Sequence, residues 1–120
     1  MRPAVLNRDA TADLMVDSEC KATAGAWISD YDGKIITVAG ELDIDHIVPL
    51  KEGWQAGAWN WTAARRREFA NDLVRPQLLA VSAASNRMKG DKDPSKWMPS
   101  NPSYHCTYAR AWIQVKHYYE

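Results

Sequence analysis

Long hydrophobic runs and an excess of charge of either sign are both missing from this sequence. No window approaches the roughly 18 to 20 apolar residues that a membrane-spanning helix needs, and residues 1–20 lack the basic-then-apolar order of a signal peptide. The 15 basic and 15 acidic residues cancel, so any surface for a polyanion must come from local grouping of charge. We expect a soluble protein with no membrane partner and no obligate protein partner. It is expected to be cytoplasmic, or secreted or at the cell surface if a signal peptide has been removed.

Cysteine and histidine are also scarce. Two cysteines, Cys20 and Cys106, are too few for a zinc cluster, and the three histidines show no ligand spacing that would complete one. A disulfide between Cys20 and Cys106 is the favoured prediction. The alternative is a pair of buried free thiols, and the choice between the two depends on the redox compartment.

What is present is enough apolar sequence for one compact domain over residues 1–120, since 46% of the residues are hydrophobic. Helix-forming residues predict a short helix over residues 4–15. The Asp32-Gly33 pair is typical of a hairpin turn, with a strand on either side of it. A further strand is predicted over residues 41–48, where it ends before Pro49.

The second half of the chain predicts more helix than strand. Residues 54–72 carry a helical pattern, for which Thr62 is a plausible N-cap. Residues 77–85 are predicted to form a short apolar strand, and Gly90 and Pro94 limit any helix that begins near Ser85 to about two turns. Residues 103–119 repeat apolar side chains at helical spacing, which predicts an amphipathic helix. The expected fold class is therefore α+β.

The segment "ELDIDHIVPL" places charge inside an otherwise apolar strand. Strict alternation would put Asp43 and Asp45 on the wet face of a half-buried strand, and His46 would then be an ordinary strand histidine. About forty residues later a second strand leads into a short helix that carries Asn86. If the two strands pair and the helix folds back across them, Asp45, His46 and Asn86 converge at one end of the unit.

These three residue types suit metal-assisted hydrolysis. A carboxylate and an amide oxygen suit a hard cation such as Mg²⁺, which keeps several waters and takes further ligands from substrate phosphate. Histidine is the side chain that takes up and returns a proton near neutral pH, so His46 is a candidate base for an attacking water. We therefore favour a functional interpretation of the segment over the ordinary strand.

Three stretches in order resemble a known family. They are "DHIVPL" followed by "AW", then "FAND", "LLAVS", "KGDKDP" and "W.P", then "Y.C.Y" and "W..VK". The pattern resembles the HNH endonucleases, also called His-Me finger or ββα-metal endonucleases. It is most similar to small HNH nucleases related to the C-terminal domain of GmrSD-type restriction enzymes. The resemblance implies a ββα-metal core, made of a two-stranded hairpin and a short helix, with an extra N-terminal hairpin and flanking helices.

The resemblance also implies a role for each residue of the site. His46 would be the general base, and Asp45 and Asn86 would hold one divalent cation, Mg²⁺ or alternatively Mn²⁺ or another cation. Asp43 matches an acidic position of several HNH domains and is a possible further or indirect ligand. Apart from the resemblance, three cationic side chains lie close to Asn86 in the sequence and are predicted to contact substrate phosphates, with ordinary surface charge as the alternative: Arg87, Lys89 and Lys92.

The function expected from these residues is hydrolysis of phosphodiester bonds in DNA with little sequence specificity. The family resemblance implies products with 5′-phosphate and 3′-hydroxyl ends. Two alternatives remain open. One is an RNA-cutting nuclease of the toxin type, which would use the same site, and the other is a nucleic-acid-binding module that has kept the fold without catalysis.

Overall fold

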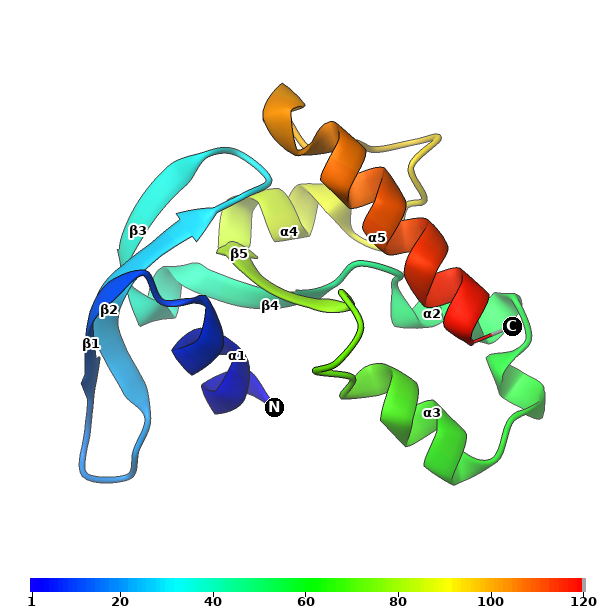
Figure 1. Cartoon of the computed structure of the whole chain (residues 1–120), viewed down its shortest axis with the longest axis horizontal. Helices are drawn as coiled ribbons and strands as arrows, with labels where there is room; N and C mark the ends of the chain where they lie inside the picture. The colour runs from blue at the N-terminus through cyan, green and yellow to red at the C-terminus, as the bar shows by residue number, and fades with distance from the viewer. Residues whose placement is uncertain (120) are drawn as a thin grey trace.

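The computed structural model describes residues 1–119 and contains two small antiparallel sheets with helices packed around them (Figure 1). In chain order the elements are α1 (Arg2–Asp9), β1 (Ala12–Val16), β2 (Ala22–Ser29), β3 (Lys34–Val38), η1 (Ala39–Glu41), β4 (Leu42–His46), α2 (Leu50–Gln55), η2 (Ala58–Asn60), α3 (Ala63–Ala70), β5 (Leu78–Ser82), α4 (Ala83–Lys89), η3 (Pro102–Tyr104) and α5 (His105–Tyr118). The α+β class predicted from the sequence is confirmed.

The sheets separate the N-terminal strands from the central pair. The first sheet has the order β1-β2-β3, and the turn that joins β2 to β3 contains Gly33 at a φ of 73°. The second sheet pairs β4 with β5, and its register places Asp45 opposite Leu79 and His46 opposite Leu78. Two strands and the helix that follows β5 therefore form a ββα unit, as the family resemblance implies.

Helix α4 packs on both β4 and β5, and its two ends are well defined. Ser82 is the N-cap, and its hydroxyl accepts a hydrogen bond from the backbone N–H of Ser85 at 3.2 Å. Gly90 ends the helix at a φ of 56°, a conformation that glycine adopts without strain. The predicted limit of about two turns for this helix is confirmed.

Two predicted helices were too long. The helix expected over residues 4–15 ends at Asp9, and residues 12–16 instead form the edge strand β1, so the N-terminal sheet has three strands. The helix expected over residues 54–72 is divided into α2, η2 and α3, because Gly57 has a φ of 135° that no helix can contain. The predicted N-cap of α3 is confirmed, since the Thr62 hydroxyl accepts from the N–H of Arg65 at 3.1 Å.

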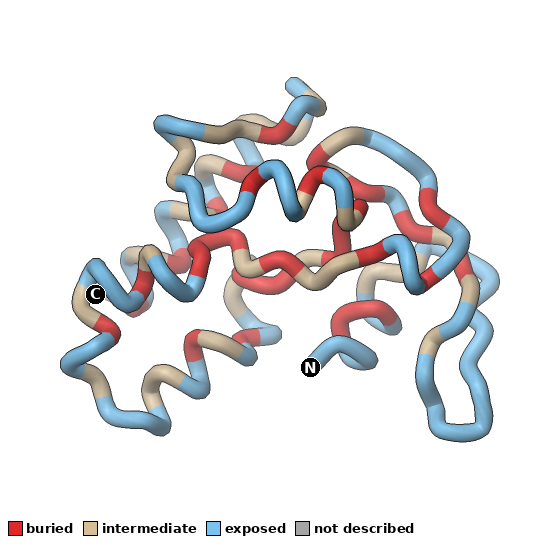
Figure 2. Tube along the Cα trace, turned by 180° about the vertical axis from the view of Figure 1, so that it is seen from behind, coloured by how far each residue is buried: buried red, intermediate tan, exposed pale blue. Residues whose placement is uncertain are grey.

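Buried residues gather along the central strands and on one side of each neighbouring helix, whereas the tip of the β1–β2 hairpin is exposed throughout (Figure 2). Helix α5 buries Tyr108, Ala111 and Val115, which lie on one face at helical spacing. Tyr108 and Ala111 pack in one cluster with Ile47 and Val81, and Val115 packs in another with Val48, so α5 covers the segment that leaves β4.

The predicted disulfide is not present within the described part of the chain. Cys20 lies in the β1–β2 turn and Cys106 in the first turn of α5, and both are free and exposed. The β1–β2 turn and the start of α5 lie apart in the fold (Figure 1), in keeping with two free thiols. The alternative of buried thiols is wrong as well, because both side chains face solvent. Among the helices of residues 1–119, none is long and apolar enough to span a bilayer.

Candidate functional site

The three predicted site residues line one open depression. It has a volume of about 290 Å³ and lies where β4 ends beside α4. Asp45 and His46 come from the last two positions of β4, and Asn86 comes from the middle of α4. The remaining lining residues are Ile44, Pro49, Leu50, Lys51, Gly90 and Asp91. The pairing of β4 with β5, followed by the fold-back of α4, thus produces the convergence that the sequence predicts.

His46 is held by a backbone carbonyl from α3. Its Nε2 atom lies 2.8 Å from the carbonyl oxygen of Ala70, the last residue of that helix. A carbonyl oxygen can only accept, so this contact requires the proton on Nε2 and leaves Nδ1 as the unprotonated nitrogen of the neutral ring. His46 is therefore fixed in the tautomer in which Nδ1 can accept a proton.

The backbone that follows His46 is fixed by Gln77, which is fully buried. The side-chain oxygen of Gln77 accepts from the N–H of Val48 at 2.9 Å, and its amide nitrogen donates to the Val48 carbonyl at 2.8 Å. The Gln77 carbonyl also accepts from the N–H of Ile47 at 2.7 Å. Because buried backbone groups are costly to leave unpaired, these bonds hold the exit of β4 in one conformation.

Asp45 is buried and has two strong partners. The Lys89 ammonium, which has no exposed surface, lies 3.1 Å from Asp45 Oδ2 and donates to Oδ1 at 3.2 Å. It also donates to the His46 carbonyl at 2.9 Å. The hydroxyl of Tyr31, from the β2–β3 turn, donates a short hydrogen bond to Oδ2. Burial has therefore been compensated by a cation and a hydroxyl, as a buried carboxylate requires.

Burial dominates the ionisation of these groups. It raises the pKa of Asp45, although the Lys89 ammonium and the Tyr31 hydroxyl act in the opposite direction. Burial lowers the pKa of Lys89, with Asp45 opposing that change. Burial and the adjacent Asp45 charge raise the pKa of Tyr31, so its hydroxyl stays protonated and donating.

Asp43 and Asn86 form the outer part of the site. The Asn86 amide nitrogen donates to Asp43 Oδ2 at 2.9 Å, which turns the amide and leaves its oxygen for another partner. Arg87 Nε lies 4.0 Å from the same carboxylate oxygen. Asp43 and Asp45 share one face of β4, as alternation predicts, but α4 covers this face, so it is not the wet face of an ordinary strand.

The cations predicted to bind phosphate have different environments. The Arg87 side chain is 78% exposed, and Lys92 is exposed with its ammonium on the Met88 carbonyl. Lys89 is enclosed between α4 and β4, so its ammonium does not reach the surface where a phosphate would lie. Lys51, which the sequence did not single out, lines the depression and pairs with Asp91 at 3.2 Å.

One further residue, Asp32, positions the start of α4, and sequence reasoning missed this role. Asp32, in the predicted hairpin turn, accepts from the hydroxyls of Ser82 at 2.7 Å and Ser85 at 3.0 Å. Partial burial raises the pKa of Asp32, but hydrogen bonds from Ser82, Ser29, Ser85 and the Lys34 backbone outweigh it, so the pKa is lowered. The sequence contains the partners of this contact, a carboxylate in the hairpin turn and two serines at the start of a helix, but nothing local indicates that they meet. The β2–β3 turn therefore supplies both Tyr31 to Asp45 and Asp32 to α4.

The oxygen donors present suit a hard cation such as Mg²⁺. A carboxylate can accept about four hydrogen bonds, and the contacts of Asp45 with Tyr31 and Lys89 leave it some capacity for one more ligand. Asn86 contributes an amide oxygen, and the open depression has room for water. Within residues 1–119, no three side chains drawn from His, Cys, Asp and Glu converge as a ready-made metal set. Waters and substrate oxygens would therefore have to complete the coordination.

Comparison with known proteins assigns the chain to a family. Residues 8–120 match the model of the C-terminal domain of GmrSD restriction endonucleases. An uncharacterized secreted protein of Arthroderma benhamiae is 50% identical over 119 residues, which cover 99% of this chain and 58% of that relative. No solved structure matches the chain. The chain therefore belongs to the family of GmrSD restriction endonuclease C-terminal domains, which points to a nuclease-related function on a nucleic acid.

Proposed function

We propose that the protein is a metal-dependent endonuclease of the HNH type that hydrolyses phosphodiester bonds in DNA with little sequence specificity. The observation that carries the proposal is the convergence of Asp45, His46 and Asn86 on one open depression at the end of the ββα unit. Family membership supports a nucleic acid as the substrate. The chain spans 58% of the length of the relative it matches, so this activity is proposed for the residues of this chain.

In the proposed mechanism, His46 Nδ1 takes a proton from a water molecule while the water oxygen bonds to phosphorus. The bond from phosphorus to the 3′ oxygen breaks, and the leaving oxygen takes a proton from solvent, which yields 5′-phosphate and 3′-hydroxyl ends. Asp45 and Asn86 would hold the divalent cation, and Asp43 orients the Asn86 amide. When bound, the cation would supply charge stabilisation to the phosphate and the departing oxygen.

Two surface cations are proposed to hold the phosphates on either side of the scissile bond. Arg87 and Lys92 are both exposed close to the depression. Lys51 is a third candidate because it lines the depression itself. Lys89 is given another role: it neutralises Asp45 and fixes the His46 backbone, so it supports the site from beneath.

The test is cleavage of supercoiled plasmid, single-stranded DNA and RNA, each with Mg²⁺ and with EDTA. We expect Mg²⁺-dependent nicking of plasmid, and we expect His46→Ala to reduce the rate by about 10²–10⁴-fold. His105→Ala is the matched control, because His105 also contacts a backbone carbonyl, that of Pro99, but lies on α5 outside the lining of the depression.

The alternatives give different results in the same experiment. Cleavage of RNA alone would identify the toxin-type nuclease. Binding of nucleic acid with no cleavage of any substrate would identify the non-catalytic module. Full activity in His46→Ala would contradict the assignment of the general base.

We also propose that the protein acts outside the cell. The relative from Arthroderma benhamiae is named as a secreted protein, and this supports export for this chain as well. Detection of the natural full-length protein in culture medium, beside a cytoplasmic marker, tests the proposal. Retention with the cytoplasmic marker would contradict it.

A further inference from the structure

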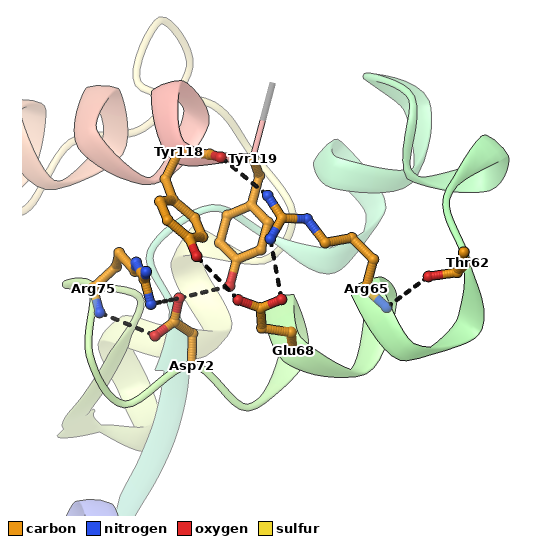
Figure 3. A network of polar contacts seen from close by, with 7 residues as sticks. All are labelled: Thr62, Arg65, Glu68, Asp72, Arg75, Tyr118 and Tyr119. Carbon is orange, nitrogen blue, oxygen red and sulfur yellow. Dashed lines mark hydrogen bonds and ion pairs between the residues drawn. The ribbon is translucent and has the colours of Figure 1, made fainter.

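A network of contacts connects α3 and the turn after it with the end of α5 (Figure 3), and α3 also carries the carbonyl that contacts His46. It starts at the Ala70 carbonyl, which accepts the proton of His46 Nε2. Ala70 is the last residue of α3, and the final carbonyls of a helix have no partner within the helix. The direction of this carbonyl therefore depends on how the end of α3 is held.

Tyr119 holds the end of α3 on both sides of Ala70. Its ring packs edge-on against Phe69 at 5.1 Å between ring centres, one residue before Ala70. Its hydroxyl donates to Asp72 Oδ2 at 2.6 Å, two residues after Ala70. Tyr119, Phe69 and Asp72 are all buried, so these contacts are sheltered from water.

Asp72 in turn fixes the backbone that leaves α3. Its Oδ1 atom accepts from the N–H of Val74 at 2.8 Å and from that of Arg75 at 3.0 Å. An aspartate that bonds backbone groups two and three residues later holds a turn in one conformation. One side chain therefore joins the turn after α3 to the last turn of the chain.

The outer layer of the network surrounds the exposed Tyr118 and joins Asp72 through Arg75, whose guanidinium lies 3.6 Å from Asp72 Oδ2. The Tyr118 hydroxyl donates to Glu68 at 3.2 Å, and its ring lies 3.5 Å from the Arg75 guanidinium carbon. Arg65 donates to Glu68 at 3.0 Å and to the Tyr118 carbonyl at 3.1 Å. Tyr118 thus contacts the same helix as Tyr119 but through an exposed contact one turn earlier, which makes it a matched control.

We propose that Asp72 and Tyr119 are positioning residues for His46: through the Ala70 carbonyl they keep the imidazole in the Nε2–H tautomer, with Nδ1 as the nitrogen that accepts a proton. The catalytic part of this inference rests on the proposed function. The tautomer part rests only on the contacts that join Tyr119, Asp72, Ala70 and His46.

The test compares Tyr119→Phe with Tyr118→Phe. Each substitution removes one hydroxyl and keeps the ring. Long-range ¹⁵N–¹H NMR of the metal-free protein at pH 8 reports the tautomer of His46. The His46 signals are assigned as those that disappear in His46→Ala. Cleavage kinetics below the melting temperature of each variant report kcat and KM separately.

We expect the Nε2–H tautomer in wild type and in Tyr118→Phe, and a mixture of tautomers in Tyr119→Phe. The kcat of Tyr119→Phe should fall by about 10- to 100-fold, as for a small misplacement of a reacting group, while KM changes by less than about 2-fold. A purely structural role would lower the melting temperature without changing the tautomer or kcat.

An unchanged tautomer in Tyr119→Phe would overturn the inference, and so would equal effects of the two tyrosine substitutions. If Tyr119→Phe does not fold, Asp72→Asn is measured in the same way and decides. Because the NMR measurement needs neither metal nor nucleic acid, it separates the two proposals. A wild-type protein without nuclease activity would overturn the proposed function. The His46 tautomer measured in Tyr119→Phe would still decide whether Tyr119 positions the imidazole.

Discussion

The Lys89 ammonium lies 3.1 Å from Asp45 Oδ2, and neither side chain is appreciably exposed to water. Both charges of a buried ion pair lose their hydration, so each charge is tolerated in the interior only while its partner is present. The pair joins α4 to β4 directly beneath the depression. The integrity of the site is therefore coupled to the stability of the ββα unit.

Lys89→Met should destabilise the protein by about 3–5 kcal/mol, because it leaves the buried Asp45 carboxylate without its cation. The double variant Lys89→Met/Asp45→Asn should recover part of this loss, since the asparagine at position 45 carries no charge that needs a cation. Urea unfolding, followed by tryptophan fluorescence, measures the free energy of unfolding of the single and the double variant. Lys92→Met, at an exposed lysine, is the control and should change stability by about 0.5 kcal/mol or less.

Tyr31→Phe should cost about 1.5–3 kcal/mol, because it removes a hydrogen bond to a buried carboxylate. Tyr108→Phe is an unusually close control. Both tyrosines are fully buried in one cluster with ring centres 5.6 Å apart, but in the described part of the chain the Tyr108 hydroxyl has no hydrogen-bond partner. Tyr108→Phe should therefore be neutral or stabilising. Equal losses of stability in the two variants would contradict this explanation.

Asn86→Ala should raise the Mg²⁺ concentration needed for half-maximal cleavage by at least about tenfold, since even the loss of an outer partner of a metal ligand costs 10- to 100-fold in affinity. Arg87→Ala, at the next residue, should instead raise KM for nucleic acid and leave the Mg²⁺ response unchanged. Titration of Mg²⁺ at saturating and at low substrate distinguishes the two. An unchanged Mg²⁺ response in Asn86→Ala would place the cation elsewhere.

Both cysteines should react as free thiols in the native protein. Cys20 and Cys106 are exposed, so a thiol reagent should titrate about two groups per chain without denaturant. Addition of a reductant should leave the melting temperature unchanged. The absence of any titratable thiol in the unreduced protein, together with a melting temperature that falls with reductant, would show that a disulfide forms in solution.

Acid should weaken the contact between α3 and α5. Burial raises the pKa of Asp72, but the hydrogen bonds from Tyr119 and from the backbone of Arg75 and Val74 outweigh it and lower the pKa below 3.8. A carboxylate with a lowered pKa stabilises the fold fully above its unfolded pKa, and this contribution is lost as the pH falls through the folded value. Wild type should therefore melt higher than Asp72→Asn at pH 6, with the difference shrinking below about pH 3.8. A difference that stays constant down to pH 2.5 would contradict the assignment.

The local features of the chain were accessible from the sequence because each depends on a few neighbouring residues. The Asp32-Gly33 turn, the N-cap at Thr62 and the end of α4 at Gly90 were all predicted and are confirmed. The meeting of Asp45, His46 and Asn86 followed from one assumption about strand pairing. Their chemical roles stay predictions.

What the sequence did not reveal depends on long-range contacts. A lysine in the segment "KGDKDP" is expected at the surface. Only the packing of α4 on β4 shows that the Lys89 ammonium is buried against Asp45. Gln77 and Tyr119 act on the site through partners 29 and 47 residues away in sequence. The β1 strand was missed because helix-forming residues continue past Asp9, and pairing with β2 overrides that preference.

Residues 47–77 separate β4 from β5, although His46 and Leu78 pair directly across the sheet. Closing so long a segment costs chain entropy before any contact of the pair is gained, whereas β2 and β3 are joined by residues 30–33 alone. During folding, the β2–β3 hairpin should therefore form early and the β4–β5 pair late, after α2 and α3 have shortened the distance to be closed. His46 would then reach its surroundings in one of the last steps, and a partly folded chain would carry no assembled site.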